Sequence, residues 1–342
     1  MTKNRDFWID AVKAICMICV YVYHTGFYYG IDYNQFVFLI KPFYVNGFFF
    51  ISGYLIFKSY TSKKRYGKDE YIKSLKNIFF RLAIPTIIFS LFTYIPKHYG
   101  SIDICNFLIN TLGGTSFWFT SAMCVSQIVM TTLFLSNKKN VWLYFLPSIL
   151  LLVIMNNSGN HETKLSEDYF PWYWQTGLTY LFVMCLGGIF HKYEENIYKC
   201  MNQPWAFILL GIAYAISACS SLVFPAYYLG LSGRNNLLGI SGMAIAILFL
   251  ILIAKRIKEN HLLQFIGKNS IVFYVLSGAV PIVVSAIANH FIEEKTYYVY
   301  ALVTLTSLAV SYGITYIITR YMPFILDLRS LSKFRKIHDN VN

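Results

Sequence analysis

Apolar runs long enough to cross a membrane recur along the whole chain. Each holds roughly 15 to 20 residues, enough for a helix to cross a hydrocarbon layer of roughly 30 Å. An outer-membrane barrel would show alternating segments of about ten residues instead, and the chain lacks that pattern. The pattern predicts an all-α polytopic membrane protein with ten transmembrane helices, near residues 9–29, 36–57, 78–96, 116–135, 141–156, 173–191, 204–224, 237–254, 270–289 and 297–320.

No soluble domain fits between these predicted spans. The longest gap, 58–77, is a charged connector, and residues 321–342 form a short basic cytoplasmic tail. The whole chain, 1–342, is therefore interpreted as one integral-membrane domain. The first apolar run is long and lacks a small-residue cleavage site, so no removable signal peptide is expected.

Lysine and arginine collect in alternate connecting segments, and this distribution sets the predicted orientation. Cytoplasmic loops of membrane proteins carry an excess of these residues. With a cytoplasmic N-terminus, most of the 29 lysines and arginines fall on the inner side. The outer segments then contain only Lys41, Lys97, Lys164, Arg234 and Lys295. Both termini are therefore predicted to be cytoplasmic, in a multi-pass protein of the cell membrane.

The composition supports lipid as the main solvent. Of all residues, 56% are hydrophobic and 13% are charged, whereas soluble domains carry about 25% charged residues. A net charge of +13 is also typical of nucleic-acid binding, but loop bias in a membrane protein explains it and no nucleic-acid partner is expected. Cys16 and Cys19 form a C-x-x-C inside a span with no second pair, which favours packing over a metal site.

Two predicted outer segments, 156–173 and 225–236, combine aromatic and polar residues. Surfaces that face carbohydrate often have this composition. Solvated loops beside an interfacial aromatic belt have it too, and both interpretations stay open.

The first span contains three ionisable residues, Asp10, Lys13 and His24. Eleven positions at about 100° each make three turns plus roughly 20°, so Lys13 and His24 share one helix face about 16 Å apart. Asp10 precedes Lys13 by three positions and shares that face. In the predicted orientation, Lys13 lies near the cytoplasmic end and His24 near the outer end.

Such groups cost about 2.5–3.5 kcal/mol each in hydrocarbon, so they normally face a bundle interior or a wet cavity. Asp10 and Lys13 could also be a pair that snorkels to the interface. His24 could be a hydrogen-bonded interior histidine at the outer boundary. The three together favour a functional stripe.

Two further stretches carry polar residues within apolar runs. In "NGFFFISGYLI" (46–56), Gly53 permits close helix approach, and Ser52 can bond to its own helix or to a neighbour. In "KSLKNIFFRLAIP" (73–85), Arg81 opens the third span and Pro85 frees carbonyls of the helix.

These pieces together resemble the membrane-bound acyltransferase 3 family. "RDFWIDAVKAICMICVYVYH", "NGFFFISGYLI" and "FFRLAIP" are similar to its arginine-to-histidine first span, its Phe-Phe-x-x-Ser-Gly core and its Arg- and Pro-bearing third span. "FWFTSAM", "LGGIFHK" and "IGKNSIVFYVLS" resemble later pieces, so the resemblance covers the chain nearly end to end. Three positions depart from the family: Lys13 replaces an arginine, Ser277 a histidine and Asn46 an aspartate.

The resemblance implies ten or so spans and an O-acyltransferase of surface or lipid-linked glycans. Its donor would be cytoplasmic acyl-CoA, most simply acetyl-CoA and alternatively a succinyl donor. His24 would be the general base on the acceptor hydroxyl or a proton shuttle at the thioester. Lys13 and Arg81 would hold donor phosphates, a common use of such cations, while Asp10 orients Lys13. Ser52 would donate to the developing oxyanion or only pack.

Two other classes of protein fit the same polar residues. A transporter or flippase for a lipid-linked glycan or exported polysaccharide would also need polar groups inside spans, although we find no paired broken helices in matching halves. A sensory or scaffolding membrane protein would need neither His24 nor Arg81. The basic connector 58–77 is either a topology signal or a donor-binding surface. The acyl group, the acceptor hydroxyl and the oligomeric state are open.

Overall fold

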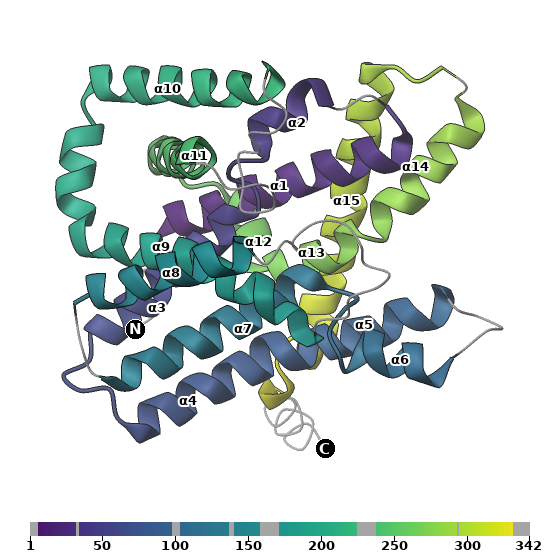
Figure 1. Ribbon diagram of the computed structural model, residues 1–342. Coiled ribbons are helices and arrows are strands. Elements are labelled where there is room, and N and C mark those ends of the chain that lie inside the picture. The colour runs from purple at the N-terminus through teal and green to yellow at the C-terminus, as the bar shows by residue number, and fades with distance from the viewer. Residues whose placement is uncertain are drawn as a thin grey trace. The chain divides into compact units, whose positions relative to one another are not determined.

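Helices form all the regular structure in the described part of the chain (Figure 1). The computed structural model describes residues 6–31, 34–97, 103–136, 140–157, 171–223, 237–292 and 294–330. The all-α prediction is therefore confirmed for these residues. The contacts divide the chain into two compact units, Met1–Ile51 with Lys192–Thr315 and Ser52–His191 with Tyr316–Asn342.

Five helices of the described residues are long and apolar enough to cross a membrane. They are Phe7–Tyr29, Lys68–Tyr94, Trp118–Ser136, Gly239–Arg256 and Tyr297–Tyr321. Two bent helix pairs, Pro171–Met201 with Pro204–Cys219 and Ser270–Ser277 with Val280–Phe291, raise the number to seven if each is one span. The protein is thus a multi-span membrane protein, while the ten spans and the cytoplasmic termini stay predictions.

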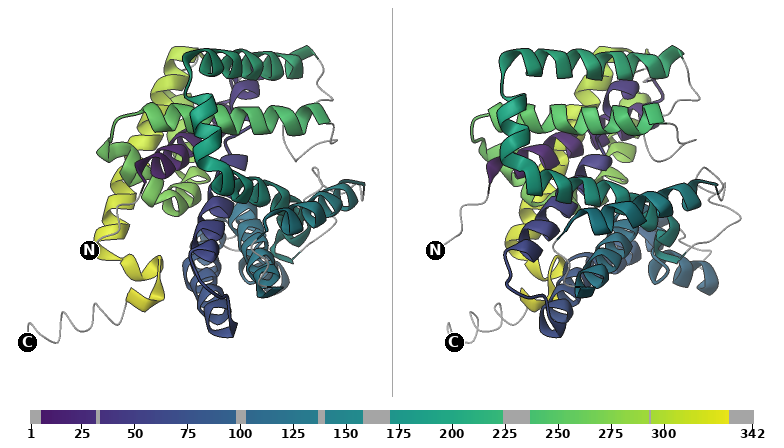
Figure 2. Two further views of the ribbon diagram at one scale, coloured as in Figure 1. Left: turned by 90° about the vertical axis from the view of Figure 1, so that its left-hand side faces the viewer. Right: turned by 60° about the vertical axis from the view of Figure 1, so that its left-hand side comes forward.

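The first unit is built around its N-terminal helix. It contains α1 (Phe7–Tyr29), α2 (Asn34–Ile40), the start of α3 (Asn46–Thr61), the end of α9 (Trp174–Met201), α10 (Pro204–Val223), α11 (Leu237–Arg256), α12 (His261–Lys268), α13 (Ser270–Ser277), α14 (Val280–Phe291) and most of α15 (Tyr297–Tyr321). Helix α1 packs against α11, α12, α13 and α14 (Figure 1). Both views of Figure 2 show α10 running beside α11.

Close backbone approach and polar contacts fix α1 in this unit. A Cβ atom at Gly267 of α12 would overlap the backbone of Asp10, so only glycine fits there. Further along α1, the Tyr21 hydroxyl donates to the Phe273 carbonyl at 3.0 Å. The hydroxyls of Thr25 and Thr304 lie 2.7 Å apart. Hydrogen bonds of this kind hold membrane helices together where lipid supplies no hydrophobic drive.

The second unit joins the middle of the chain to the end of α15. It contains the rest of α3, α4 (Lys68–Ile78), the π-helical η1 (Phe79–Ala83), α5 (Ile84–Lys97), α6 (Ile104–Thr111), α7 (Trp118–Leu133), η2 (Phe134–Ser136), α8 (Trp142–Asn157), η3 (Pro171–Tyr173), most of α9, η4 (Pro323–Ile325) and η5 (Leu328–Ser330).

Glycines bring α3, α7 and α9 into close contact in the second unit. A Cβ atom at Gly53 would overlap the backbone of Met184, and one at Gly188 would meet the ring of Phe57. The Ser126 hydroxyl of α7 donates to the Gly177 carbonyl of α9 at 2.7 Å. The prediction that Gly53 permits close helix approach is therefore confirmed.

The predicted charged connector 58–77 is helical over its second half. Helix α4 starts at Lys68, where the Glu70 carboxylate accepts a hydrogen bond from the Gly67 backbone N–H. Acidic residues in a first turn favour the helix. The helix then runs through η1 into α5, where the Ile84 N–H donates to the Phe79 carbonyl. Proline has no backbone N–H to donate, and the π-helical turn just before Pro85 accommodates this missing hydrogen bond.

Two predicted spans are broken rather than continuous. The span 36–57 is interrupted between α2 and α3, because Pro42 disfavours helical geometry at the residue before it. The Asn46 amide then donates to the Pro42 carbonyl at 2.8 Å. The span 270–289 is bent by 43° between α13 and α14, where Gly278 ends one helix and Pro281 begins the next.

The two predicted outer segments and the predicted C-terminal tail lie mostly outside the residues that the structure describes. Residues 158–170, 225–236 and 331–342 lie outside the described residues. The predicted tail begins in the last turn of α15 and continues through η4 and η5.

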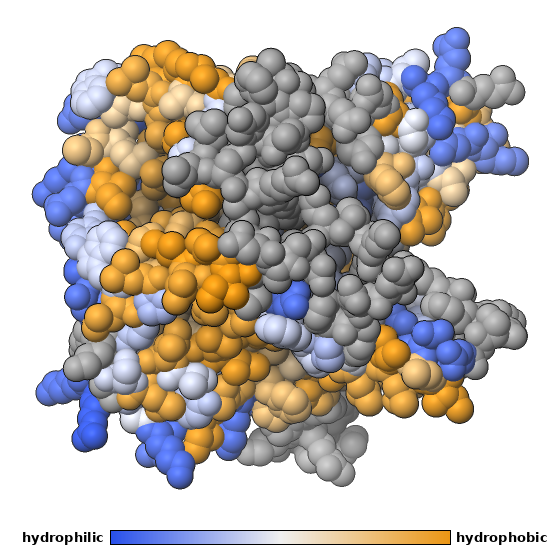
Figure 3. Space-filling view, in the orientation of Figure 1, coloured by the Kyte–Doolittle hydropathy of each residue, from blue (hydrophilic) through white to orange (hydrophobic). Residues whose placement is uncertain are grey.

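Large apolar side chains are exposed on helices of both units, and Figure 3 shows them as broad patches. On α10 they are Trp205, Ile208, Leu209, Ile212 and Ile216, and on α8 they are Leu143, Leu146 and Leu150. Exposed apolar surface on this scale marks contact with another apolar phase. In a protein with several membrane-long helices, that phase is lipid.

Candidate active site

One ridge of α1 carries three of the predicted site residues. Asp10 is fully buried, and Lys13 and His24 are half-buried. Between the last two, Met17 and Val20 lie on the same face, and both are buried. The ridge therefore faces protein at Asp10 and through its middle, while Lys13 and His24 are each partly exposed.

The N-terminal end of this ridge is closely packed. Asp10 lies in the first turn of α1, where a carboxylate interacts favourably with the helix dipole. In the same unit, the Lys255 ammonium donates to the Glu194 carboxylate at 2.8 Å. That ammonium also lies over the ring of Trp8, 5.1 Å from its centroid. This ion pair beside the start of α1 was not predicted, because its partners are far apart in sequence.

Aromatic rings fix the orientation of His24 at the other end of the ridge. Tyr28 stacks on the imidazole with ring centroids 6.0 Å apart and planes inclined by 13°. Tyr23 meets it edge-on at 5.5 Å, and Tyr44 lies against Tyr23 at 5.9 Å. Among the described residues, none forms a hydrogen bond with the imidazole. The role of His24 as a base or as an interior histidine therefore stays a prediction.

Ser52 lies in the second unit and joins two helices. The Gln127 side-chain amide of α7 donates to the Ser52 hydroxyl of α3 at 2.8 Å. As a hydroxyl, Ser52 also has a proton of its own to donate. The sequence suggested a bond to a neighbouring helix but did not identify Gln127.

Ser52→Ala is expected to destabilise the protein by about 1 kcal/mol, because the half-buried Gln127 amide loses its acceptor. If Ser52 mainly packs, kcat stays within a few-fold of wild type. A double-mutant cycle with Gln127→Ala, read by thermal melting and kcat, separates the roles. A large loss of kcat with unchanged stability would show that Ser52 acts on the reaction instead.

Arg81 also lies in the second unit, on η1, and its side chain is 69% exposed. Its Nε lies 3.5 Å from a carboxylate oxygen of Asp327, in the segment after α15. The same carboxylate binds Arg329 at 2.7 Å. Hydrogen bonds from Arg329 are the main cause that lowers the pKa of Asp327 below its usual value, so Asp327 is ionised near neutral pH.

Two positions that depart from the family pattern make structural hydrogen bonds. The Ser277 hydroxyl is buried at the end of α13 and donates to the Tyr274 carbonyl at 2.6 Å. Asn46 is buried at the start of α3 and bonds Pro42. Both side chains thus form hydrogen bonds at the points where one helix ends and the next begins.

The family model described as an acyltransferase domain, that of the acyltransferase 3 family, matches residues 6–320. The chain therefore belongs to the acyltransferase 3 family, as the sequence motifs indicated. It is a membrane-bound acyltransferase, an enzyme that transfers acyl groups other than aminoacyl groups. No curated protein and no solved structure matches the chain.

Proposed function

We propose that the protein is an O-acyltransferase of the cell membrane. It moves an acetyl group, or alternatively a succinyl group, from cytoplasmic acyl-CoA to a hydroxyl of an extracytoplasmic or lipid-linked glycan. The observation that carries this proposal is the ridge of α1, with Lys13 and His24 at its two ends and buried Met17 and Val20 between them.

In this proposal His24 is the general base. Its imidazole takes the proton of the acceptor hydroxyl, and the hydroxyl oxygen attacks the thioester carbonyl. The C–S bond then breaks, and the departing thiolate of coenzyme A takes the proton back from the imidazolium. Imidazole suits both steps because a ring nitrogen can accept a proton and then return it. Tyr28 and Tyr23 hold the ring in place, which lowers the entropy cost of reaching the reactive geometry.

The donor is held by cations in this scheme. Coenzyme A carries several phosphate charges, and lysine and arginine bind phosphate through charge-assisted hydrogen bonds. We assign this role to Lys13 and, as a separate assignment, to Arg81. Asp10, three residues before Lys13 on α1, orients the lysine. No metal takes part in the proposed reaction.

Lys13→Met is expected to raise the KM for acyl-CoA by about 10–100-fold, since a charged hydrogen bond contributes about 1.5–3 kcal/mol. Lys13→Arg keeps the charge and is expected to keep most of the activity. Initial rates at varied donor concentration, in membranes with matched protein levels, measure both. An unchanged donor KM in Lys13→Met would remove Lys13 from the donor site.

Mass spectrometry of surface glycans from cells with and without the gene tests the overall function. The proposal expects a glycan that is lighter in the deletion strain by a fixed mass per modified sugar, about 42 Da for an acetyl group. Restoring the gene restores the mass, and the His24→Ala gene does not. Identical glycans in all strains would contradict the assigned acceptor class.

A further inference from the structure

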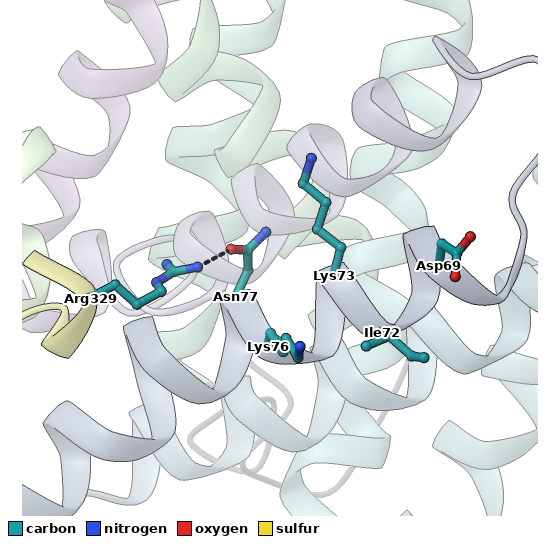
Figure 4. Close-up of a pocket in the computed structure, with 6 residues that line it drawn as sticks. All are labelled: Asp69, Ile72, Lys73, Lys76, Asn77 and Arg329. Carbon is teal, nitrogen blue, oxygen red and sulfur yellow. Dashed lines mark hydrogen bonds between the residues drawn. The ribbon is translucent and has the colours of Figure 1, made fainter. Parts of the chain in front are cut away.

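A cavity of about 310 Å³ lies in the second unit, between α4 and the segment after α15. Its lining residues are Asp69, Ile72, Lys73, Lys76, Asn77 and Arg329. Figure 4 shows all but Arg329 projecting from α4, with Arg329 reaching Asn77 from the C-terminal segment. Three cations and one carboxylate line the cavity, so its charge favours an anion.

The two lysines of this cavity are arranged unfavourably unless an anion is present. Lys73 and Lys76 are exposed and three positions apart on α4, so they are neighbours on the helix surface. Like charges at this spacing repel. Neither ammonium group has an ion pair or hydrogen bond with the residues that the structure describes. An anion in the cavity would reduce this repulsion.

Arg329 lines one side of the cavity as part of a hydrogen-bonded network. Its Nε donates to Oδ1 of Asp327 at 2.8 Å and its Nη2 to Oδ2 at 2.7 Å. Its Nη1 donates to the Asn77 side-chain oxygen at 2.8 Å, and its guanidinium lies 5.3 Å from the ring centroid of Phe80. The guanidinium is therefore held in one orientation at the edge of the cavity, and its fork is bound by the Asp327 carboxylate.

We propose that this cavity binds a phosphate group, with Lys73 and Lys76 supplying charge and charge-assisted hydrogen bonds beside the fixed Arg329–Asp327 pair. Two sources carry this chemistry, a phosphate monoester of a soluble nucleotide and the headgroup of an anionic lipid. The nucleotide source would extend the donor site and to that extent rests on the proposed function. The phosphate site itself does not depend on His24.

The test uses the purified full-length protein in nanodiscs and two probes. The first probe is adenosine 3′,5′-bisphosphate, titrated in discs of zwitterionic lipid. The second is phosphatidylglycerol, present or absent in the disc and read by the thermal midpoint. The test variant is Lys73→Gln with Lys76→Gln. The matched control is Lys199→Gln with Lys258→Gln, which removes the same charge from exposed lysines outside the cavity.

With a nucleotide source, the bisphosphate is expected to bind wild type and control equally and the test variant about tenfold more weakly. With a lipid source, phosphatidylglycerol raises the midpoint of wild type and control but not of the test variant. If the test variant matches the control with both probes, the phosphate site is overturned. His24→Ala should leave both responses unchanged, so loss of transfer and loss of this site are distinguishable.

Discussion

His24→Ala is expected to lower the rate of acyl transfer by about 10²–10⁴-fold, the usual contribution of general acid–base catalysis. The imidazole is half-buried, stacked on Tyr28 and without a hydrogen-bonding partner among the described residues. Its removal therefore takes away the proposed base without leaving a buried polar group unsatisfied. The protein level and the thermal midpoint should change little. The measurement is the initial rate of transfer at saturating donor in membranes.

His290→Ala is the matched control for this variant. His290 is an exposed histidine on α14 of the same unit, and its ring lies against Phe291. Its substitution should leave the transfer rate unchanged. Equal rates in wild type, His24→Ala and His290→Ala would remove His24 from the mechanism.

Gly53→Ala is expected to destabilise the second unit strongly. A methyl group at this position would overlap the backbone of Met184 in α9. Overpacking usually costs about 1–3 kcal/mol, and more where the obstacle cannot move. A helix backbone cannot rotate away as a side chain can, so we expect at least the upper end of this range. Thermal melting of the solubilised protein and the yield of folded protein measure the effect.

Gly313→Ala is the control, because a Cβ atom at Gly313 would meet nothing within 4 Å. Gly313 lies inside α15, where alanine is favoured over glycine by about 0.5–1 kcal/mol. The two substitutions are chemically identical and should have opposite signs. A Gly53→Ala protein as stable as Gly313→Ala would show that α3 and α9 do not approach as closely as described.

The long apolar helices could be predicted because their signal is local. The limits of α1, α11 and α15 lie within a few residues of the predicted spans. The two broken spans were missed because their apolar content continues through the break, although Pro42 and Pro281 lie near the breaks. The sequence identified residues 58–77 only as a charged connector, because α4 is charged and its start is marked by a contact between Glu70 and the Gly67 backbone.

The candidate site also has a part that the sequence predicted and a part that it did not. Asp10, Lys13 and His24 belong to one helix, so helix geometry alone placed them on one ridge. The partners of Ser52 and Arg81 are Gln127 and Asp327. These contacts arise from packing between segments far apart in the chain, which periodicity does not encode. The C-terminal segment in particular carried only a topology signal in the sequence.

The central claim is that Lys13 and His24 act from opposite ends of one ridge, so donor and acceptor meet from opposite sides of the membrane. Proteoliposomes with uniformly oriented protein test it, with acetyl-CoA supplied only at the face bearing the N-terminus and glycan extract only at the other face. We predict that coenzyme A thiol is released at the donor face and acetyl ester forms at the acceptor face in equal amounts. Glycan that crosses the membrane without thiol release, or ester that forms only when both substrates share a face, would contradict the account.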